Sequence, residues 1–179
     1  MQANADSIKT WLLFPLLTAA LWVVLFHLNG LFFSSFSLSS YISWIFLPAA
    51  VRLLSVMVMG LPAALGLWVG TFITCEPELG VNVIESVEIS FLSALGPVIA
   101  VALCTRGLRL RHDLNGLRTQ HMAVFSLIAA TCNVLPHFLL FAYLGKVVSL
   151  SALIPMFAGD VTGTWVVLYV ASALLRLLP

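Results

Sequence analysis

The stretch "IPMFAGDVTGTWVVLYVASALLRLLP" (Ile154–Pro179) is apolar and long enough to cross a lipid bilayer, yet it contains the carboxylate of Asp160. A spanning helix needs about 20 mainly apolar residues. An ionised side chain at the centre of such a helix costs roughly 2.5–3.5 kcal/mol, so it tends to pair with another group or to line a cavity. The stretch therefore predicts a membrane helix whose Asp160 faces the protein interior.

The whole chain has the composition of an integral membrane protein. Of its 179 residues, 61% are hydrophobic and 8% are charged, whereas soluble domains are about 45–50% apolar and about 25% charged. The formal net charge of +1 gives no reason to expect a nucleic acid partner. Cys75, Cys104 and Cys132 have no CxxC spacing and are interpreted as buried small hydrophobic residues. Neither a metal site nor a cofactor is predicted.

About six apolar segments are predicted to cross the membrane as helices, several of them kinked by proline and glycine. "GLP" (Gly60–Pro62) predicts a tight helical hairpin between the second and third segments. The third segment is short, so a tilted or re-entrant helix is an alternative there. The predicted crossings are Trp11–Asn29, Ile42–Gly60, Leu61–Cys75, Ile89–Thr105, Met122–Tyr143 and Leu153–Leu177. The sequence thus predicts an all-α integral membrane protein with a single transmembrane domain over residues 1–179.

The basic residues predict the orientation, because cytoplasmic loops carry an excess of Lys and Arg. A basic loop over residues 106–121 follows the fourth crossing, whereas the segment Cys75–Glu88 before that crossing contains glutamates and no basic residue. With about six crossings, both termini are then cytoplasmic, including the short polar segment 1–10. The loop arginines are also candidates for contact with anionic lipid headgroups or a cytoplasmic partner; they are Arg106, Arg109, Arg111 and Arg118.

Two ionisable residues inside the predicted helices are expected to meet. Counted from the outer ends of their helices at 1.5 Å per residue, Arg52 lies at a depth of roughly 15 Å and Asp160 at roughly 11 Å. Charge-assisted hydrogen bonds between them would offset the cost of burying both. The pair is interpreted either as a fixed ion pair that sets helix register or as a site that holds and releases a polar ligand or a proton.

Other residues are candidates for helix packing or for a polar site. Asn133 and His137 lie one turn apart in "TCNVLPHF" (Thr131–Phe138) and are interpreted as interhelical hydrogen-bonding residues or as part of the same polar site. Glu85 and Glu88 open the fourth crossing, where acidic residues suit the helix dipole; a mouth for a cation or a basic ligand is the alternative. Glycines expected to allow close helix approach are Gly66, Gly70, Gly96, Gly159 and Gly163.

The order of several motifs resembles the first type of bacterial membrane-associated sensor domain, the MASE family. "ISWIFLPAAV" (Ile42–Val51) followed by "GLPAALGLWVGTF" (Gly60–Phe72) is similar to the opening signature of that family. "FAGDVTGTWVVLYV" (Phe157–Val170) resembles its closing helix, which places Gly159, Asp160 and Gly163 on the GDxxG motif. The fourth crossing departs from the family, since Pro97 and Ala100 stand where the family has Asn and Glu.

The resemblance implies a sensor in the bacterial plasma membrane that recognises a small ligand or a membrane partner. Family members precede a cyclase, phosphodiesterase or histidine kinase module, so this chain is expected to pass its signal to a separate protein. Two alternatives remain: the substrate-binding subunit of a vitamin-type importer, and a scaffold or assembly subunit of a membrane complex. The chain has no nucleotide-binding loop or supported nucleophile–base pair, so no enzyme is predicted. A homo-oligomer is compatible with the sequence.

Overall fold

The computed structural model describes residues 2–39, 42–79, 82–107, 119–145 and 150–177. Within these ranges the chain forms six α-helices and one short antiparallel hairpin. Four helical segments are long and apolar enough to cross a membrane, as in a multi-pass membrane protein; they are Thr10–Phe36, Val83–Gly107, Thr119–Tyr143 and Ser151–Leu174.

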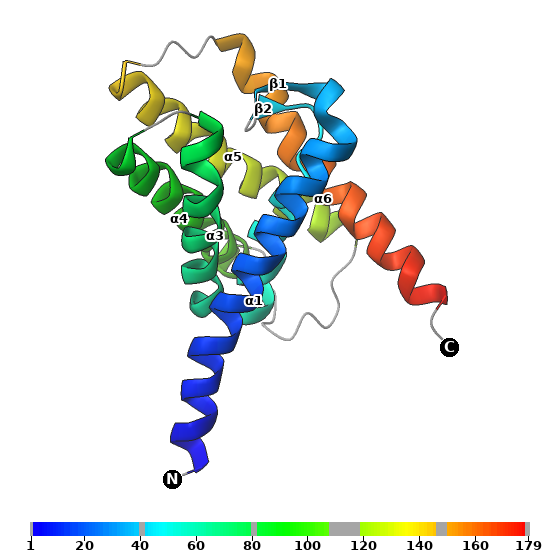
Figure 1. The fold of residues 1–179 in the computed structure, drawn as a ribbon. Helices are drawn as coiled ribbons and strands as arrows, with labels where there is room; N and C mark the ends of the chain where they lie inside the picture. Colours follow the sequence, from blue (N-terminus) through cyan, green and yellow to red (C-terminus); the bar gives the residue numbers. More distant parts are fainter. Residues whose placement is uncertain (1, 40–41, 80–81, 108–118, 146–149, 178–179) are drawn as a thin grey trace.

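The helices form a bundle, and the N-terminal and C-terminal ends of the chain leave this bundle in different directions (Figure 1). Helix α1 packs on α3, α3 on α4 and α4 on α5, while α2 packs against α6. The C-terminal half of α6 extends away from the other helices, and its side chains from Tyr169 to Leu174 are exposed. In order, the elements are α1 (Gln2–Phe33), a 3-10 turn (Ser34–Phe36), β1 (Ser37–Ser39), β2 (Ile42–Ser43), α2 (Pro48–Met59), α3 (Leu61–Leu79), α4 (Val83–Gly107), α5 (Thr119–Tyr143) and α6 (Leu150–Leu177).

The first, fourth, fifth and sixth predicted crossings each fall within one long helix, namely α1, α4, α5 and α6. The second does not form a helix over its whole predicted length. Helix α2 begins at Pro48 rather than at Ile42, and its 12 residues are about 18 Å long, against a hydrocarbon thickness of about 30 Å. The apolar part of α3, Leu61–Cys75, is also shorter than the four long segments.

Proline explains where α2 starts. Pro48 has no N–H to donate to the carbonyl of Trp44 one turn earlier, and its ring would collide with that carbonyl in a continuous helix. Pro48 is instead the first residue of α2, the position at which a missing N–H costs nothing. The residues between β2 and α2 consequently cross part of the bundle without helical structure.

The backbone of this non-helical segment, residues 44–47, is hydrogen-bonded to α1 and α6. In a membrane, backbone that is neither helix nor closed sheet is tolerated only where protein satisfies its polar groups. The bonds run from Thr162 Oγ1 to the Trp44 carbonyl (2.6 Å), from the Phe46 N–H to the Gly159 carbonyl (3.0 Å) and from the Leu47 N–H to Asn29 Oδ1 (2.8 Å).

The two glycines of the "GDVTG" motif make room for this segment. A Cβ atom at Gly159 would overlap the carbonyl oxygen of Ser43, and one at Gly163 would overlap the carbonyl oxygen of Phe46. The sequence predicted that these glycines allow another helix to approach. The structure places non-helical backbone against them instead, from Ser43 at the end of β2 to Phe46. The Trp44 carbonyl and the Phe46 N–H of this stretch form the bonds to α6 described above.

The remaining glycines lie where helix meets helix. A Cβ at Gly66 would overlap the backbone of α1 at Pro15, and a Cβ at Gly70 would lie 3.0 Å from the Trp22 side chain. Gly96 of α4 lies against the α5 backbone, where a Cβ would be 2.9 Å from a carbonyl oxygen. The close approach of α1 to α3 and of α4 to α5 therefore depends on the absence of a side chain at these positions.

Candidate functional site

A buried ion pair joins α2 to α6. Arg52 lies on the second turn of α2 and Asp160 in the first half of α6, and their atoms Nη2 and Oδ1 are 2.8 Å apart. The two residues are only 6% and 5% exposed. The contact expected from the sequence is thus present, between residues that are 108 positions apart in the chain. In such an environment each charge depends on the other for compensation.

The second oxygen of the same carboxylate connects the pair to α5. Asn133 Nδ2 donates a hydrogen bond of 2.7 Å to Asp160 Oδ2, and Asn133 is 3% exposed. Arg52, Asn133 and Asp160 are called the polar junction below. One turn after Asp160, the Thr164 hydroxyl donates to the Asp160 backbone carbonyl at 2.7 Å. The polar junction therefore fixes three helices to one another through a single carboxylate.

Two aromatic rings enclose the guanidinium of Arg52. Its Cζ atom lies 5.5 Å from the ring centroid of Trp22 on α1 and 5.3 Å from that of Phe46 before α2. Distances within about 6 Å allow a cation–π attraction, which is strongest for desolvated cations. Trp22 is itself held by a hydrogen bond of 3.0 Å from Nε1 to Thr74 Oγ1 on α3. The surroundings of Arg52 are therefore compatible with its positive charge even though the residue is buried.

A small cavity of about 10 Å³ borders the polar junction, and its polar lining includes Ser126 and Thr164. Asn133 Oδ1 is buried and has no hydrogen-bond partner among the described residues. A cavity of this size accommodates roughly one water molecule, and a buried amide oxygen is a suitable acceptor for it. In this conformation the polar junction can accept a water but has no room for an organic ligand.

His137 lies beside the polar junction without joining it. Its Nδ1 atom is 2.7 Å from the backbone carbonyl of Asn133, and its ring packs at 6.2 Å from that of Phe141. A carbonyl oxygen only accepts hydrogen bonds, so Nδ1 carries the proton. Within the described part of the chain, no hydrogen bond links the imidazole to Asp160. His137 therefore closes a hydrogen bond within α5. Its ring also interacts with the backbone of Ile89 on α4, as expected of an interhelical polar residue.

The two glutamates at the start of α4 have different surroundings. The Glu85 N–H donates to Asn82 Oδ1 at 2.9 Å, and the Asn82 N–H donates to Glu85 Oε2 at 3.3 Å. This reciprocal pair is a capping box, which accounts for Glu85 as a helix-terminal residue. Glu88 Oε2 is buried without a hydrogen-bond partner in the described residues. Those residues also contain no group of three or more side chains placed to hold a metal ion.

Two larger hollows lie elsewhere on the molecule. One, of about 410 Å³, lies at the C-terminal end of α1, and its polar lining is His27, Asn29, Ser34 and Ser37. We call it the α1 groove. The other, of about 670 Å³, is lined by α2, the start of α3 and α4, and includes Arg106. The other predicted loop arginines, Arg109, Arg111 and Arg118, lie outside the described residues.

Sequence reasoning did not identify Trp22, Phe46 or Asn29 as parts of this site. Trp22 and Phe46 are aromatic residues in apolar segments, and such segments contain aromatic residues on lipid-facing and inward-facing sides alike. Asn29 is a polar residue near the end of a predicted crossing, which is an available signal, but its partner Leu47 N–H is revealed only by the non-helical backbone before α2.

Comparison with protein-family models, curated proteins and solved structures found no match to this chain. The resemblance to membrane-associated sensor domains therefore stays a prediction from the sequence.

Proposed function

We propose that the chain is a sensor module of the bacterial plasma membrane, in which the polar junction holds α6 in one position and a stimulus changes that position. The observation that carries the proposal is the carboxylate of Asp160, which is bonded to Arg52 of α2 and to Asn133 of α5 at the same time. Packed interfaces of this kind change between discrete arrangements rather than deforming continuously. A change at one carboxylate would then alter how three helices meet.

Helix α6 is the element suited to carry the signal. Asp160 lies in its buried half, whereas the half that follows is exposed and extends away from the bundle (Figure 1). At 1.5 Å per residue, Leu174 is about 21 Å further along the helix than Asp160. A small rotation or shift of α6 at the polar junction would therefore displace its far end, where a signalling partner could detect the movement.

The α1 groove is the proposed input. Its volume of about 410 Å³ lies within the range of small-molecule sites, about 300–1,000 Å³. Asn29 lines this groove and also accepts the hydrogen bond of the Leu47 N–H, directly before α2. Since Arg52 lies on the second turn of α2, a ligand that moves Asn29 would act on the polar junction through α2. Such a ligand shifts the equilibrium only if its affinity differs between the two arrangements.

The topology that goes with this proposal has about six crossings and cytoplasmic termini. The short helix α2, together with the non-helical residues before it, forms the second crossing, and α3 forms the third. The basic residues from Arg106 onward then lie on the cytoplasmic side, in agreement with the positive-inside rule. A partner protein that receives the signal would meet the chain on that side.

Purification of the full chain in a mild detergent, followed by identification of bound proteins, tests the proposal. A kinase, cyclase or phosphodiesterase supports the sensor; ATPase subunits would indicate the importer, and a large structural complex would indicate a scaffold. The Asp160→Asn variant is then compared with wild type in complex with its partner. A sensor requires that the partner's activity changes while the complex stays intact, and unchanged activity would contradict the role of the polar junction.

A further inference from the structure

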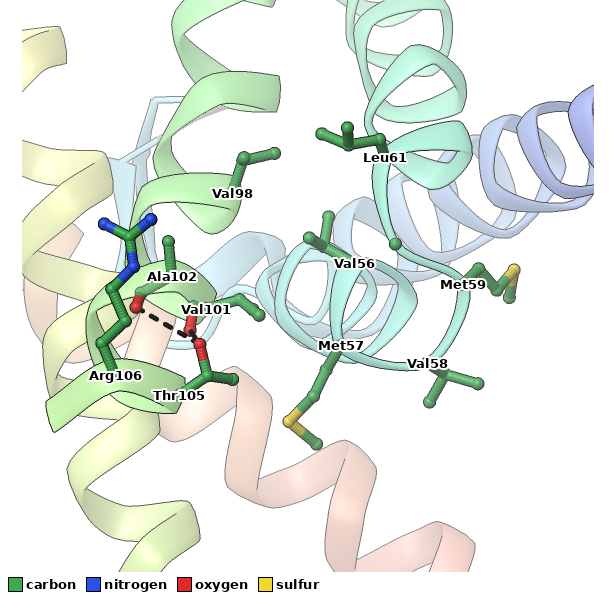
Figure 2. A pocket seen from close by; sticks show the side chains of 11 residues that line it. Val56, Met57, Val58, Met59, Leu61, Val98, Val101, Ala102, Thr105 and Arg106 are labelled. Carbon is green, nitrogen blue, oxygen red and sulfur yellow. Dashed lines mark hydrogen bonds between the residues drawn. The ribbon is translucent and has the colours of Figure 1, made fainter. Parts of the chain in front are cut away.

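The hollow at the junction of α2 and α3 is an open groove with apolar walls and a cation at one end (Figure 2). We call it the α2–α4 groove. Its walls come from the last turn of α2, the first residue of α3 and one face of α4, and its volume is about 670 Å³. Apolar side chains that line it include Val56, Val58, Leu61, Val98 and Val101.

Arg106 is the charged residue that lines the α2–α4 groove. The Thr105 hydroxyl is already engaged, because it donates to the backbone carbonyls of Val101 at 2.8 Å and Ala102 at 3.3 Å. Figure 2 shows both bonds and places Arg106 at the edge of the groove. Arg106 is exposed, and no carboxylate or hydrogen-bond acceptor among the described residues contacts its guanidinium. Within the part of the chain that the structure describes, the groove thus presents a cation without a counter-charge beside apolar walls.

We propose that the α2–α4 groove binds an anionic phospholipid, with the phosphate at Arg106 and part of one acyl chain along the apolar walls. A guanidinium matches a phosphate with two parallel hydrogen bonds. From Arg106 to Val98 the wall on α4 runs for about 12 Å, which is long enough to hold the upper part of an acyl chain. Arg106 also lies next to the end of the long apolar segment Val83–Gly107, where headgroups are expected.

Charge complementarity favours this occupant over a second copy of the chain or a neutral lipid. A neutral apolar partner would fill the walls and leave the guanidinium without a counter-charge, whereas an anionic lipid satisfies both features at once. Basic pockets between membrane helices on the cytoplasmic side recognise such headgroups by the same chemistry. The inference concerns binding alone and does not depend on the sensor proposal.

Native mass spectrometry of the detergent-solubilised full chain tests the inference. The protein is titrated with phosphatidylglycerol or with phosphatidylcholine that has the same acyl chains, and bound lipids are counted. Wild type is expected to retain phosphatidylglycerol preferentially. A hydrogen bond to a charged group contributes about 1.5 kcal/mol or more, so Arg106→Gln should lower phosphatidylglycerol occupancy about ten-fold. Arg106→Lys should keep most of the preference, and phosphatidylcholine binding should not change.

Two controls separate the groove from the general basic surface. Arg109→Gln removes the same charge at the next basic position in the sequence and should have a smaller effect than Arg106→Gln. Ala102→Leu adds a side chain to a groove wall and should lower binding of both lipids, whereas Ala142→Leu, at an exposed position on α5, should not.

Three results would overturn the inference. The first is an unchanged lipid preference in Arg106→Gln, whose exposed position leaves the fold intact. The second is an equal loss in Arg106→Gln and Arg109→Gln, which would indicate diffuse attraction to the basic segment. The third is a bound protein that Arg106→Gln releases while the lipid ratio stays as in wild type, which would identify the groove as a protein contact.

Discussion

Replacing Asp160 by asparagine removes one charge of the buried ion pair and leaves the guanidinium of Arg52 without its counter-charge. The two groups are 2.8 Å apart, and both residues are more than nine-tenths buried. Breaking one side of a buried pair typically costs about 3–5 kcal/mol of unfolding free energy, because the remaining charge is uncompensated. We expect about 3 kcal/mol for Asp160→Asn, since the unfolded chain in a membrane also finds polar partners.

Removing both charges should cost far less than the two single changes together. Arg52→Gln alone leaves the Asp160 carboxylate buried and should also cost about 3 kcal/mol. The double variant Arg52→Gln/Asp160→Asn replaces the ion pair by two neutral amides that can hydrogen-bond to each other. We expect a loss of about 3 kcal/mol for the double variant, against about 6 kcal/mol for the sum of the single variants. The coupling energy of about 3 kcal/mol is at the upper end for residues in direct contact.

Reversible unfolding in mixed micelles, with an increasing fraction of denaturing detergent, measures these free energies. The chain contains 5 tryptophans, and Trp22 lies over the guanidinium of Arg52, so intrinsic fluorescence reports on this region. Glu88→Gln is the matched control, because it makes the same kind of change at a buried carboxylate oxygen without a described hydrogen-bond partner. It should leave stability unchanged or raise it.

The reasoning is refuted if the loss in the double variant equals the sum of the two single losses within about 0.5 kcal/mol, the range of additivity for independent sites. A loss well below 1 kcal/mol for both single variants would also refute it, because such values are typical of solvent-exposed pairs.

Three further predictions concern the packing around the polar junction. Gly163→Ala should destabilise the protein by about 1–3 kcal/mol, because the added methyl group overlaps the Phe46 carbonyl. Gly30 has open space around it, so Gly30→Ala should instead stabilise α1 by about 0.5–1 kcal/mol. Chemical unfolding of the two variants in parallel distinguishes them. Trp22→Phe removes the hydrogen bond from the indole to Thr74 and should cost about 1 kcal/mol of unfolding free energy. Trp22→Leu also removes the aromatic face over the Arg52 guanidinium and should cost more. Equal losses of unfolding free energy in the two variants would exclude a cation–π contribution. Asn29→Leu leaves the buried backbone N–H of Leu47 without its acceptor and should cost about 1–3 kcal/mol of unfolding free energy. Faster hydrogen exchange at the Leu47 amide is the direct readout.

The position at which α2 begins could be predicted in part from the sequence. Pro48 cannot donate a hydrogen bond to Trp44, so a helix that runs unbroken from Ile42 conflicts with the chemistry of proline. Apolar composition alone predicts a second crossing from Ile42, but the proline ring overrides it and α2 begins at Pro48. What the sequence could not supply is how the freed backbone groups are satisfied, since their partners are Asn29 of α1 and two residues of α6.

The residues that line the candidate site could be identified only from the tertiary structure, for a general reason. In a membrane protein the lipid and the interior are both apolar, so hydrophobic periodicity does not show which face of a helix points inward. Nothing local in the sequence distinguishes Trp22, which is fully buried, from Trp11, which is 50% exposed. The size of the cavity at Asn133 likewise follows from the packing of α2, α4, α5 and α6 together.

By itself, the sequence determined the membrane class, most of the long helices and the pairing of Arg52 with Asp160. These features follow from one energetic rule, because a charge in hydrocarbon is too costly to remain uncompensated and few charges are available to compensate it. Only the tertiary structure decided that the glycines of "GDVTG" receive a non-helical segment, that Asn133 shares the carboxylate, and that the cavity beside it holds no more than about one water. Those properties depend on how the helices are rotated and on where the backbone leaves the helix, and packing between distant segments sets both.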